Sequence, residues 1–308
     1  MADLAGDMKQ QTGLSIRGGG IRGIVPACCL VKLEQQLGGL TRDHIDYCAG
    51  TSTGALLAAG IAAGVPAKQL LKVYTERSRE IFTPSGILAD AKRIAKGFMY
   101  DPANLRRVLV ETFFPESKMT LNDSPLRLMI TATAMNGRNW YFVQDNPKNA
   151  RTTGKVSLVD AAVASSCAPT YFEDSIITLP SGKPLAFFDG GCGGTANPVY
   201  QACVEAFEYD TFDPQNTRVI SLGTGFYPGS DAVPKGLLAG IGWVTSTLID
   251  SSEDWADEAV NRHWPGLLQT FNPELPSSID EADTSAIPQL VKIGEKMADS
   301  MDWRKILA

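Results

Sequence analysis

Histidine is nearly absent from this chain, which has only His44 and His263 among its 308 residues. Because imidazole is the usual base beside a nucleophilic serine or cysteine, this scarcity limits the hydrolytic mechanisms open to the chain. The six cysteines form no C-x-x-C pair, and no histidine lies at a spacing typical of zinc sites. We therefore expect no metal and no other cofactor, and we interpret the cysteines as buried free thiols in a reducing compartment.

Long apolar runs are also missing, since no window reaches the ~18 uninterrupted apolar residues of a membrane-spanning helix. Residues 1–11 lack the apolar core of a signal peptide. Positive charge is not in excess either: 28 Lys and Arg face 34 Asp and Glu, for a net charge of −6. This balance argues against nucleic-acid binding, which needs a basic face. We expect a soluble, cytoplasmic protein.

The chain has what a large globular core needs, with 44% hydrophobic and 20% charged residues. Strands are expected at 14–16, 45–49, 126–134, 139–144, 185–188 and 218–222. Helices are expected at 24–37, 55–63, 67–80, 104–112, 156–165, 197–207, 237–251, 253–263 and 287–301. This alternation predicts an α/β fold with a mostly parallel central sheet. With no repeat or linker, we expect one domain over 1–308, with its motifs in a core at 12–226 and closing helices at 233–308.

Residues 50–54 (Gly-Thr-Ser-Thr-Gly) lie between an apolar strand and a buried helix. A serine flanked by glycines two residues away on each side, at such a turn, is typical of a nucleophile elbow. The turn lifts the serine hydroxyl clear of the sheet, and the following helix favours negative charge at its N-terminal end. Alone, the pattern is also a common chance match, so Ser52 is a candidate whose support must come from elsewhere in the chain.

A glycine-rich run at 17–23 (Arg-Gly-Gly-Gly-Ile-Arg-Gly) follows the first strand and opens a helix. One interpretation is a nucleotide-binding loop, because Gly18, Gly20 and Gly23 match G-x-G-x-x-G. The acidic residue that should follow about 20 residues later is missing, however, and the P-loop pattern is absent. The other interpretation is an oxyanion hole, favoured by the serine elbow downstream. Arg22 either adds positive charge near this site or forms a surface ion pair.

Asp189 is the better of the candidate bases for Ser52. It ends an apolar strand and precedes two glycines, which we expect to put its carboxylate at the sheet edge where the serine emerges. Burial there would raise its pKa and improve proton transfer. His44 precedes the serine's strand and is interpreted as structural. His263 leaves a Ser-His-Asp hydrolase formally available.

Residues 81–100 mix aromatic and aliphatic side chains with lysine and arginine. One interpretation is a flap that contacts a lipid surface, so that the protein associates transiently with membranes. The other is an ordinary surface loop and helix packed on the core.

These motifs together resemble the patatin-like phospholipase family. The resemblance rests on residues 18–23, 50–54 and 189–191 in that order, with support from 164–172 and 221–225. It implies a three-layer α/β/α fold, a Ser-Asp dyad without histidine or metal, and hydrolysis of fatty-acyl esters of lipids.

Carried over to this chain, the resemblance makes Ser52 the nucleophile and Asp189 the base. It implies an oxyanion hole formed by the amides of Gly18, Gly19, Gly20 and the neighbouring Ile21. One position departs from the family, which usually has aspartate before the three glycines where this chain has Arg17. That arginine either anchors the loop differently or, with Arg22, offers a cation to anionic substrates. A further alternative is a lipid- or protein-binding scaffold that has kept the fold without catalysis.

Overall fold

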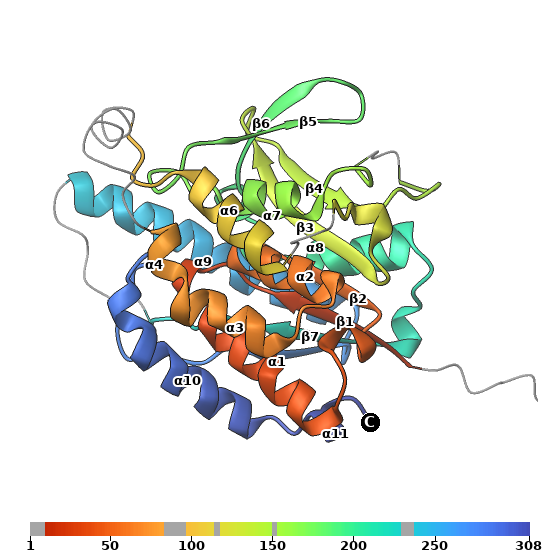
Figure 1. The fold of residues 1–308 in the computed structure, drawn as a ribbon. Coiled ribbons are helices and arrows are strands. Elements are labelled where there is room, and N and C mark those ends of the chain that lie inside the picture. The colour runs from red at the N-terminus through yellow and green to blue at the C-terminus, as the bar shows by residue number, and fades with distance from the viewer. Residues whose placement is uncertain (1–9, 83–96, 114–117, 150–152, 229–236) are drawn as a thin grey trace, which may run out of the picture.

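A sheet of eight strands crosses the middle of the computed structural model (Figure 1). The structure describes residues 10–82, 97–113, 118–149, 153–228 and 237–308, with only the backbone for 237–246. The strand order is β5-β6-β3-β2-β1-β7-β8, with β4 paired to β3. The strands are β1 (Gln11–Ile16), β2 (Tyr47–Gly50), β3 (Arg127–Ala134), β4 (Asn139–Val143), β5 (Ser175–Thr178), β6 (Pro184–Asp189), β7 (Thr217–Leu222) and β8 (Leu268–Phe271).

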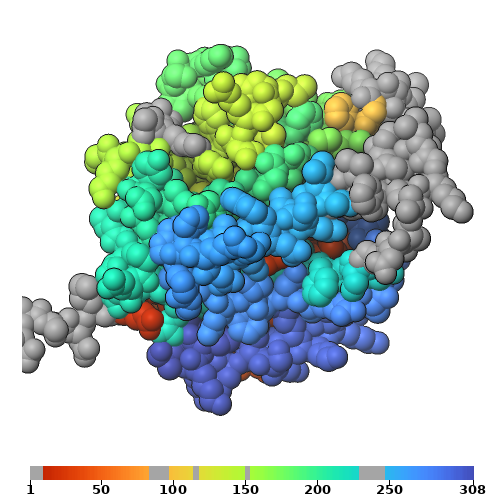
Figure 2. Space-filling view, turned by 180° about the vertical axis from the view of Figure 1, so that it is seen from behind, coloured from red at the N-terminus to blue at the C-terminus, as the bar shows by residue number. Residues whose placement is uncertain are grey.

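Helices cover both faces of the sheet, as Figure 1 shows. They are α1 (Ile24–Leu37), α2 (Thr53–Ala63), α3 (Ala67–Glu76), α4 (Ser78–Ile81), α6 (Pro102–Phe113), α7 (Leu158–Ser166), α8 (Val199–Val204), α9 (Leu237–His263), α10 (Ile287–Ser300) and α11 (Trp303–Ile306). On one face lie α1, α2, α3 and α10, and on the other lie α8 and α9. The light-blue surface of α9 occupies the centre of the reverse view (Figure 2). The expected three-layer α/β/α arrangement is confirmed.

Strand direction divides the sheet into two parts. The pairs β1–β2, β1–β7, β2–β3 and β7–β8 are parallel, whereas β3–β4, β3–β6 and β5–β6 are antiparallel. The mostly parallel sheet is therefore confirmed for its centre and for the β8 edge. The antiparallel strands gather at the other edge.

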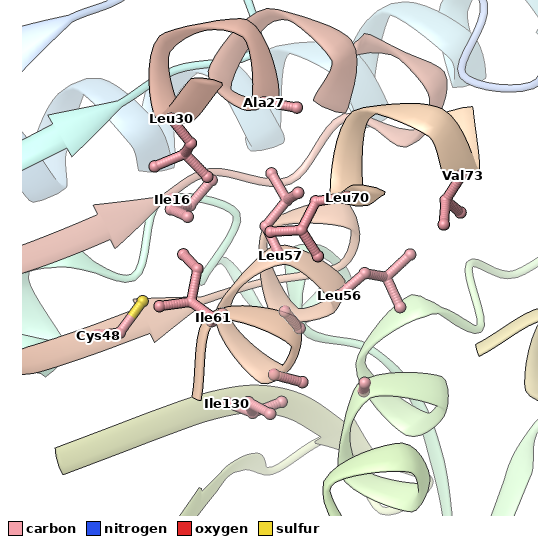
Figure 3. Packing of buried hydrophobic residues seen from close by; sticks show 14 of the residues in the cluster. Ile16, Ala27, Leu30, Cys48, Leu56, Leu57, Ile61, Leu70, Val73 and Ile130 are labelled. Carbon is pink, nitrogen blue, oxygen red and sulfur yellow. The ribbon is translucent and has the colours of Figure 1, made fainter. Parts of the chain in front are cut away.

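The small-residue helix α2 lies at the centre of the core, and only its last residue, Ala63, is not fully buried. Leu57 and Ile61 point toward α1 and β1, and Ile130 of β3 lies on the other side (Figure 3). Each such side chain contributes roughly 1.5–3 kcal/mol when fully buried. This packing fixes the first turn of α2 against the carboxyl ends of β1 and β2.

Some sequence expectations were wrong in detail. Residues 237–263 form one helix rather than two, since Ser251 and Ser252 continue α9 without a break. The expected helix at 67–80 is interrupted at Arg77. Cys192 is exposed, although the other five cysteines are buried, and all six are free.

Most of the expected flap lies outside the described residues, which resume at Gly97. Phe82 and Tyr100, which lie on either side of that gap, pack on each other and on Phe172, with ring centroids 5.4–6.0 Å apart. Within the part of the chain that is described, no helix combines the length and apolarity needed to span a bilayer.

Candidate active site

Ser52 occupies the turn between β2, which ends at Gly50, and α2, which begins at Thr53. Its backbone has φ 55° and ψ −123°, a strained conformation that costs a non-glycine residue roughly 1–3 kcal/mol. The Ser52 amide donates a 2.8 Å hydrogen bond to Oγ of Ser165 on α7, which holds the turn in place. The positive end of the α2 dipole therefore faces the serine, as expected of a nucleophile elbow.

Asp189 reaches the serine from the antiparallel edge of the sheet. Gly50 of β2 is in register with Ile130 of β3, and Ala132 of β3 is in register with Asp189. Ser52, two residues beyond Gly50, thus lies level with Asp189. The strand that carries Asp189 is antiparallel rather than one of the parallel strands, because β6 runs against β3 and stops at the height of the elbow.

The Asp189 carboxyl is buried and accepts a 2.8 Å hydrogen bond from the Gly191 amide. Burial, with a smaller contribution from the nearby Glu281 carboxylate, raises the pKa of Asp189 to about 7, against the Ser52 hydroxyl and the Gly191 amide, which lower it. A carboxylate with a pKa near neutrality is a far better proton acceptor than one in water.

The glycine loop (residues 17–23) lies beside the elbow, but two of the four amides expected as oxyanion donors are already engaged. The Gly18 amide donates to the Ala196 carbonyl at 2.9 Å, and the Ile21 amide donates to the Glu281 carbonyl at 2.8 Å. In this structure, therefore, Gly18 and Ile21 are not free to bind an oxyanion. The expectation of donors at all four positions from Gly18 to Ile21 needs correction.

Gly19 and Gly20 keep amides without hydrogen-bond partners among the described residues. Their neighbour Gly18 packs so closely on the elbow that a Cβ there would lie 3.3 Å from Cβ of Ser52. The two unpartnered amides thus belong to the segment next to the serine. They are the donors that this loop retains for a negatively charged oxygen.

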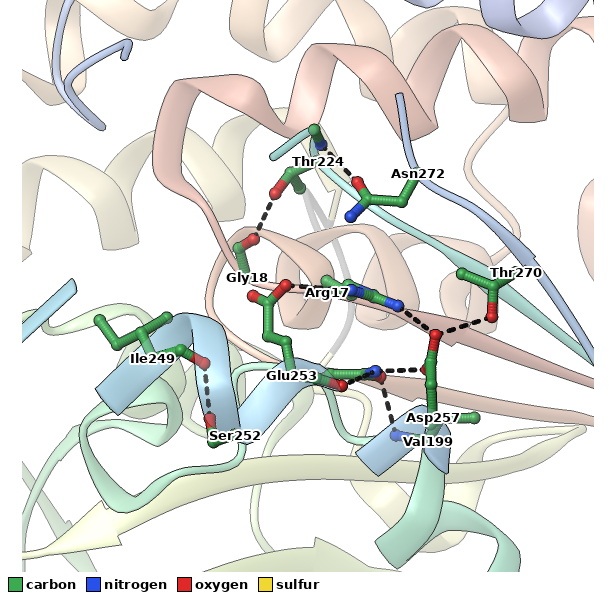
Figure 4. A network of polar contacts seen from close by, with 12 residues as sticks. Arg17, Gly18, Val199, Thr224, Ile249, Ser252, Glu253, Asp257, Thr270 and Asn272 are labelled. Atoms are coloured by element: carbon green, nitrogen blue, oxygen red, sulfur yellow. Dashed lines mark hydrogen bonds and ion pairs between the residues drawn. The ribbon is translucent and has the colours of Figure 1, made fainter. Parts of the chain in front are cut away.

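Arg17 is buried at the start of the glycine loop. Its guanidinium forms ion pairs with Glu253, at 3.1 Å, and Asp257, at 2.7 Å, on α9 (Figure 4). The expectation of Arg17 as an anion contact was wrong, because carboxylates already bind both Nη atoms of its guanidinium. The alternative, that it anchors the loop differently, agrees with this geometry.

Arg22 also supports the loop. Its Nε donates to the Gly19 carbonyl and its Nη1 to the Gly225 carbonyl, each at 3.2 Å. Its Nη2 lies 3.8 Å from the Glu281 carboxylate. Arg22 therefore already has three partners: two backbone carbonyls and one carboxylate.

Glu281 was not expected from the sequence, yet its segment covers the glycine loop. Besides accepting the Ile21 amide, its main chain occupies the space that a Cβ on Gly20 would need. The preceding Asp280 accepts a 2.7 Å hydrogen bond from the Tyr171 hydroxyl. No local pattern could have signalled this contact, since some 260 residues separate Ile21 from Glu281.

An apolar cavity of about 50 Å³ opens beside Ser52. Its walls are mainly aliphatic and aromatic, with Leu56 of α2, Tyr74 of α3, Ile81 of α4, Leu105 of α6 and Phe172 among the side chains that line it. Glu281 lines the same cavity. The nucleophile thus faces a pocket suited to a hydrocarbon chain.

Both histidines lie near the amino ends of the parallel strands, whereas Ser52 lies at their carboxyl ends. His44 precedes β2 and contacts the Gly38 carbonyl at 2.6 Å. His263 ends α9, before the amino end of β8, and packs on Tyr200. Because β2 and β8 run in the same direction through the sheet and Ser52 follows the carboxyl end of β2, a triad with His263 is excluded by this geometry.

The described residues do not favour a metal site or a nucleotide-binding site. They contain no group of three His, Cys, Asp or Glu side chains arranged to hold a metal. A nucleotide phosphate at the glycine loop would meet the carboxylates of Asp189 and Glu281, which share this site. The loop geometry therefore supports the oxyanion interpretation.

Known proteins resemble this chain in sequence and in fold. The profile of the family described as "Patatin-like phospholipase" matches residues 14–202. A "cGAMP-activated phospholipase" of Pseudomonas aeruginosa is 32% identical over 219 residues, which cover 68% of this chain and 61% of that protein. "Patatin-like protein 2" of Oryza sativa subsp. indica is 28% identical and covers 95% of this chain and 84% of that protein.

The chain spans only 61–66% of the length of the first three cGAMP-activated phospholipases that it matches. Among solved structures, VipD from Legionella pneumophila aligns with a TM-score of 0.50 at 12% identity, over 95% of this chain and 67% of that one. At that identity the likeness concerns the fold alone. The central sheet with flanking helices is thus shared beyond recognisable sequence similarity.

Proposed function

Given that the chain belongs to the patatin-like phospholipase family, we propose that it is a serine acyl hydrolase that cleaves fatty-acyl esters of lipids. One observation carries the proposal: Ser52, in a strained elbow, lies next to the buried Asp189 carboxyl and beside an apolar cavity. In this proposal Ser52 is the nucleophile and Asp189 the base, and no histidine or metal takes part.

The first half-reaction forms an acyl-enzyme. Asp189 accepts the Ser52 proton while Oγ attacks the ester carbonyl carbon, and the protonated Asp189 then gives that proton to the leaving alcohol. The pKa of about 7 suits both roles, because the same carboxyl must accept and release a proton near neutral pH. The α2 N-terminus stabilises the negative charge that builds up next to Ser52.

The oxyanion of the tetrahedral intermediate would be held by the amides of Gly19 and Gly20. Donors of this kind are typically worth about 10²–10³ in kcat each, since they bind the charge only once it develops. In the second half-reaction Asp189 takes a proton from water, whose oxygen attacks the acyl-enzyme. Ser52 recovers its proton as the fatty acid leaves.

The substrate class follows from the cavity and from the relatives. The apolar walls suit an acyl chain, but about 50 Å³ holds only a few water molecules. The lining side chains and the Glu281 segment therefore have to move apart when a long chain enters. We further propose transient contact with membrane surfaces, where such substrates reside, by a cytoplasmic protein.

The experiment is product analysis by mass spectrometry after incubation with vesicles that contain phospholipids and neutral acylglycerols. The wild-type protein should release free fatty acid, and Ser52→Ala should release none above background. A fluorophosphonate probe should label the peptide that contains Ser52. Absence of both release and labelling in the wild-type protein would favour the scaffold alternative, and release by Ser52→Ala would refute Ser52 as the nucleophile.

A further inference from the structure

We propose that Arg17 is a positioning residue for the oxyanion donors, acting through a partly buried ion-pair clamp between the glycine loop and α9. The clamp consists of Arg17, Glu253 and Asp257 (Figure 4). Asn197 also belongs to it, through a hydrogen bond to Asp257. This inference rests on the proposed hydrolase function. It goes beyond that function by giving a role to the position at which this chain departs from its family.

The geometry of the clamp is specific to arginine. Its side chain is only 4% exposed, and its Nη1 and Nη2 bind different carboxylates, those of Glu253 and Asp257. These carboxylates lie four residues apart on α9, and therefore on the same face of the helix. A planar guanidinium can bind both at once, whereas the single ammonium of lysine is a point charge on a flexible stem.

The clamp also reaches the loop through the main chain. Nδ2 of Asn197 donates to the Asp257 carboxylate at 2.7 Å and to the Glu253 carbonyl at 3.1 Å. The residue before it, Ala196, accepts the Gly18 amide at 2.9 Å. The loop is thus tied to α9 in two ways: by the Arg17 side chain, and by the Gly18 amide through Ala196 and its neighbour Asn197.

A displacement at Arg17 would pass directly to the nucleophile. The Thr51 amide donates to the Ile16 carbonyl at 3.3 Å, and Gly54 packs against the carbonyls of Ile16 and Arg17. The elbow therefore rests on the two residues that precede the glycines. Catalytic groups must be held within about 0.5 Å of productive geometry, so the clamp sets the distance between the donors and Ser52.

The same residues do not contact substrate. None of Arg17, Glu253 and Asp257 lines the cavity beside Ser52. Instead, the buried Arg17 guanidinium lies between the two partly buried carboxylates. An aspartate at position 17 would face Glu253 and Asp257 as a third carboxylate, so this α9 surface is matched to arginine.

The test is a neutral triple variant, Arg17→Met with Glu253→Gln and Asp257→Asn, which removes the ion pairs without leaving an unpaired buried charge. We expect kcat for a soluble p-nitrophenyl ester, per fluorophosphonate-titrated site, to fall about 30-fold, since small misplacements cost up to about 100-fold. KM should stay within twofold. The inhibition constant of a trifluoromethyl ketone, whose serine adduct carries an oxyanion, should rise by a similar factor.

The matched control is Arg262→Met with Glu258→Gln, an exposed pair on the same helix, which should change none of these values. The inference is overturned if the triple variant keeps both kcat and the inhibition constant within twofold, or if only KM changes. Should the triple variant not fold, Arg17→Lys decides: a kcat reduced severalfold at unchanged KM supports the clamp, and a wild-type kcat contradicts it. If wild-type protein neither hydrolyses nor labels, the proposed function fails instead.

Discussion

At the scale of single residues, the chemistry depends on two carboxyl groups that share one site. Glu281 is the second cause, after burial, of the raised pKa of Asp189. Asp189 serves as a base only when it is deprotonated, so activity should rise with pH as this group titrates near pH 7. The electrostatic environment of Asp189 therefore sets the acid side of the pH–rate profile.

Glu281→Gln tests this dependence. Removing the negative charge lowers the pKa of Asp189, so the acid limb of kcat/KM should move to lower pH. The measurement is the hydrolysis of a p-nitrophenyl ester by wild type and variant between pH 5 and 9. Glu274→Gln, an exposed carboxyl seven residues earlier, should leave the profile in place. An acid limb at the wild-type pH in Glu281→Gln would rule out this coupling between Glu281 and Asp189.

The sequence indicated Ser52 and Asp189 through local signals. Ser52 follows a strand with a glycine two residues away on each side, and Asp189 ends a strand and precedes two glycines. The partners of these residues could not be found in the same way. Glu281 meets the glycine loop from 260 residues away, and the carboxylates that bind Arg17 lie about 240 residues from it. Their roles depend on how the chain closes, which no short pattern reveals.

At the scale of elements, the close contact between β1 and α2 determines where the nucleophile lies. A Cβ on Gly54 would overlap the Ile16 carbonyl, so the first turn of α2 would have to move. The contact is between backbone atoms and cannot be relieved by a change of rotamer. Gly54 is thus required for the short distance between the elbow and the glycine loop.

Gly54→Ala should destabilise the fold by about 1–3 kcal/mol, as overpacking usually does, and should lower kcat as well because Ser52 is displaced. Urea unfolding and ester hydrolysis measure the two effects. Gly13→Ala is the control, since a Cβ at that β1 position makes ordinary contact with Val219 at 3.4 Å. Wild-type stability and activity in Gly54→Ala would contradict the role of this contact.

Helix α1 matched its expected range, because Gly38, with φ 76°, ends it. The four-residue strands β5 and β8 were missed, since such short, partly exposed segments carry little periodicity. The direction of β6 was not predicted either. Local sequence predicts a strand but not which neighbour it pairs with, and Asp189 reaches Ser52 only through that pairing.

At the scale of the whole molecule, the C-terminal segment connects the site to the outer helical layer. After β8 the chain passes the glycine loop at Glu281, continues into α10, and ends with α11 packed on α1. Trp303 is fully buried there, and its Nε1 donates to the Cys29 carbonyl at 3.1 Å. The segment that contributes Glu281 is therefore held at both ends by packed structure.

Trp303→Ala should reduce the free energy of unfolding by about 3–5 kcal/mol, as truncation of a large buried side chain does. The kcat per titrated site should be unchanged, because Trp303 does not line the cavity beside Ser52. Chemical denaturation with active-site titration gives both quantities. Trp255→Ala, at a residue that is 53% exposed, should alter stability by less than about 1 kcal/mol. Equal stability losses in the two variants would contradict this assignment.

The central claim is that Asp189 activates Ser52 without histidine, and the rate of fatty-acid release by Asp189→Asn tests it most directly. The amide keeps the shape of the side chain but cannot accept the serine proton. We predict a fall in kcat of about 10³-fold, within the usual range for loss of a general base, and an unchanged rate for His263→Ala. A wild-type rate in Asp189→Asn, together with loss of activity in His263→Ala, would contradict the account.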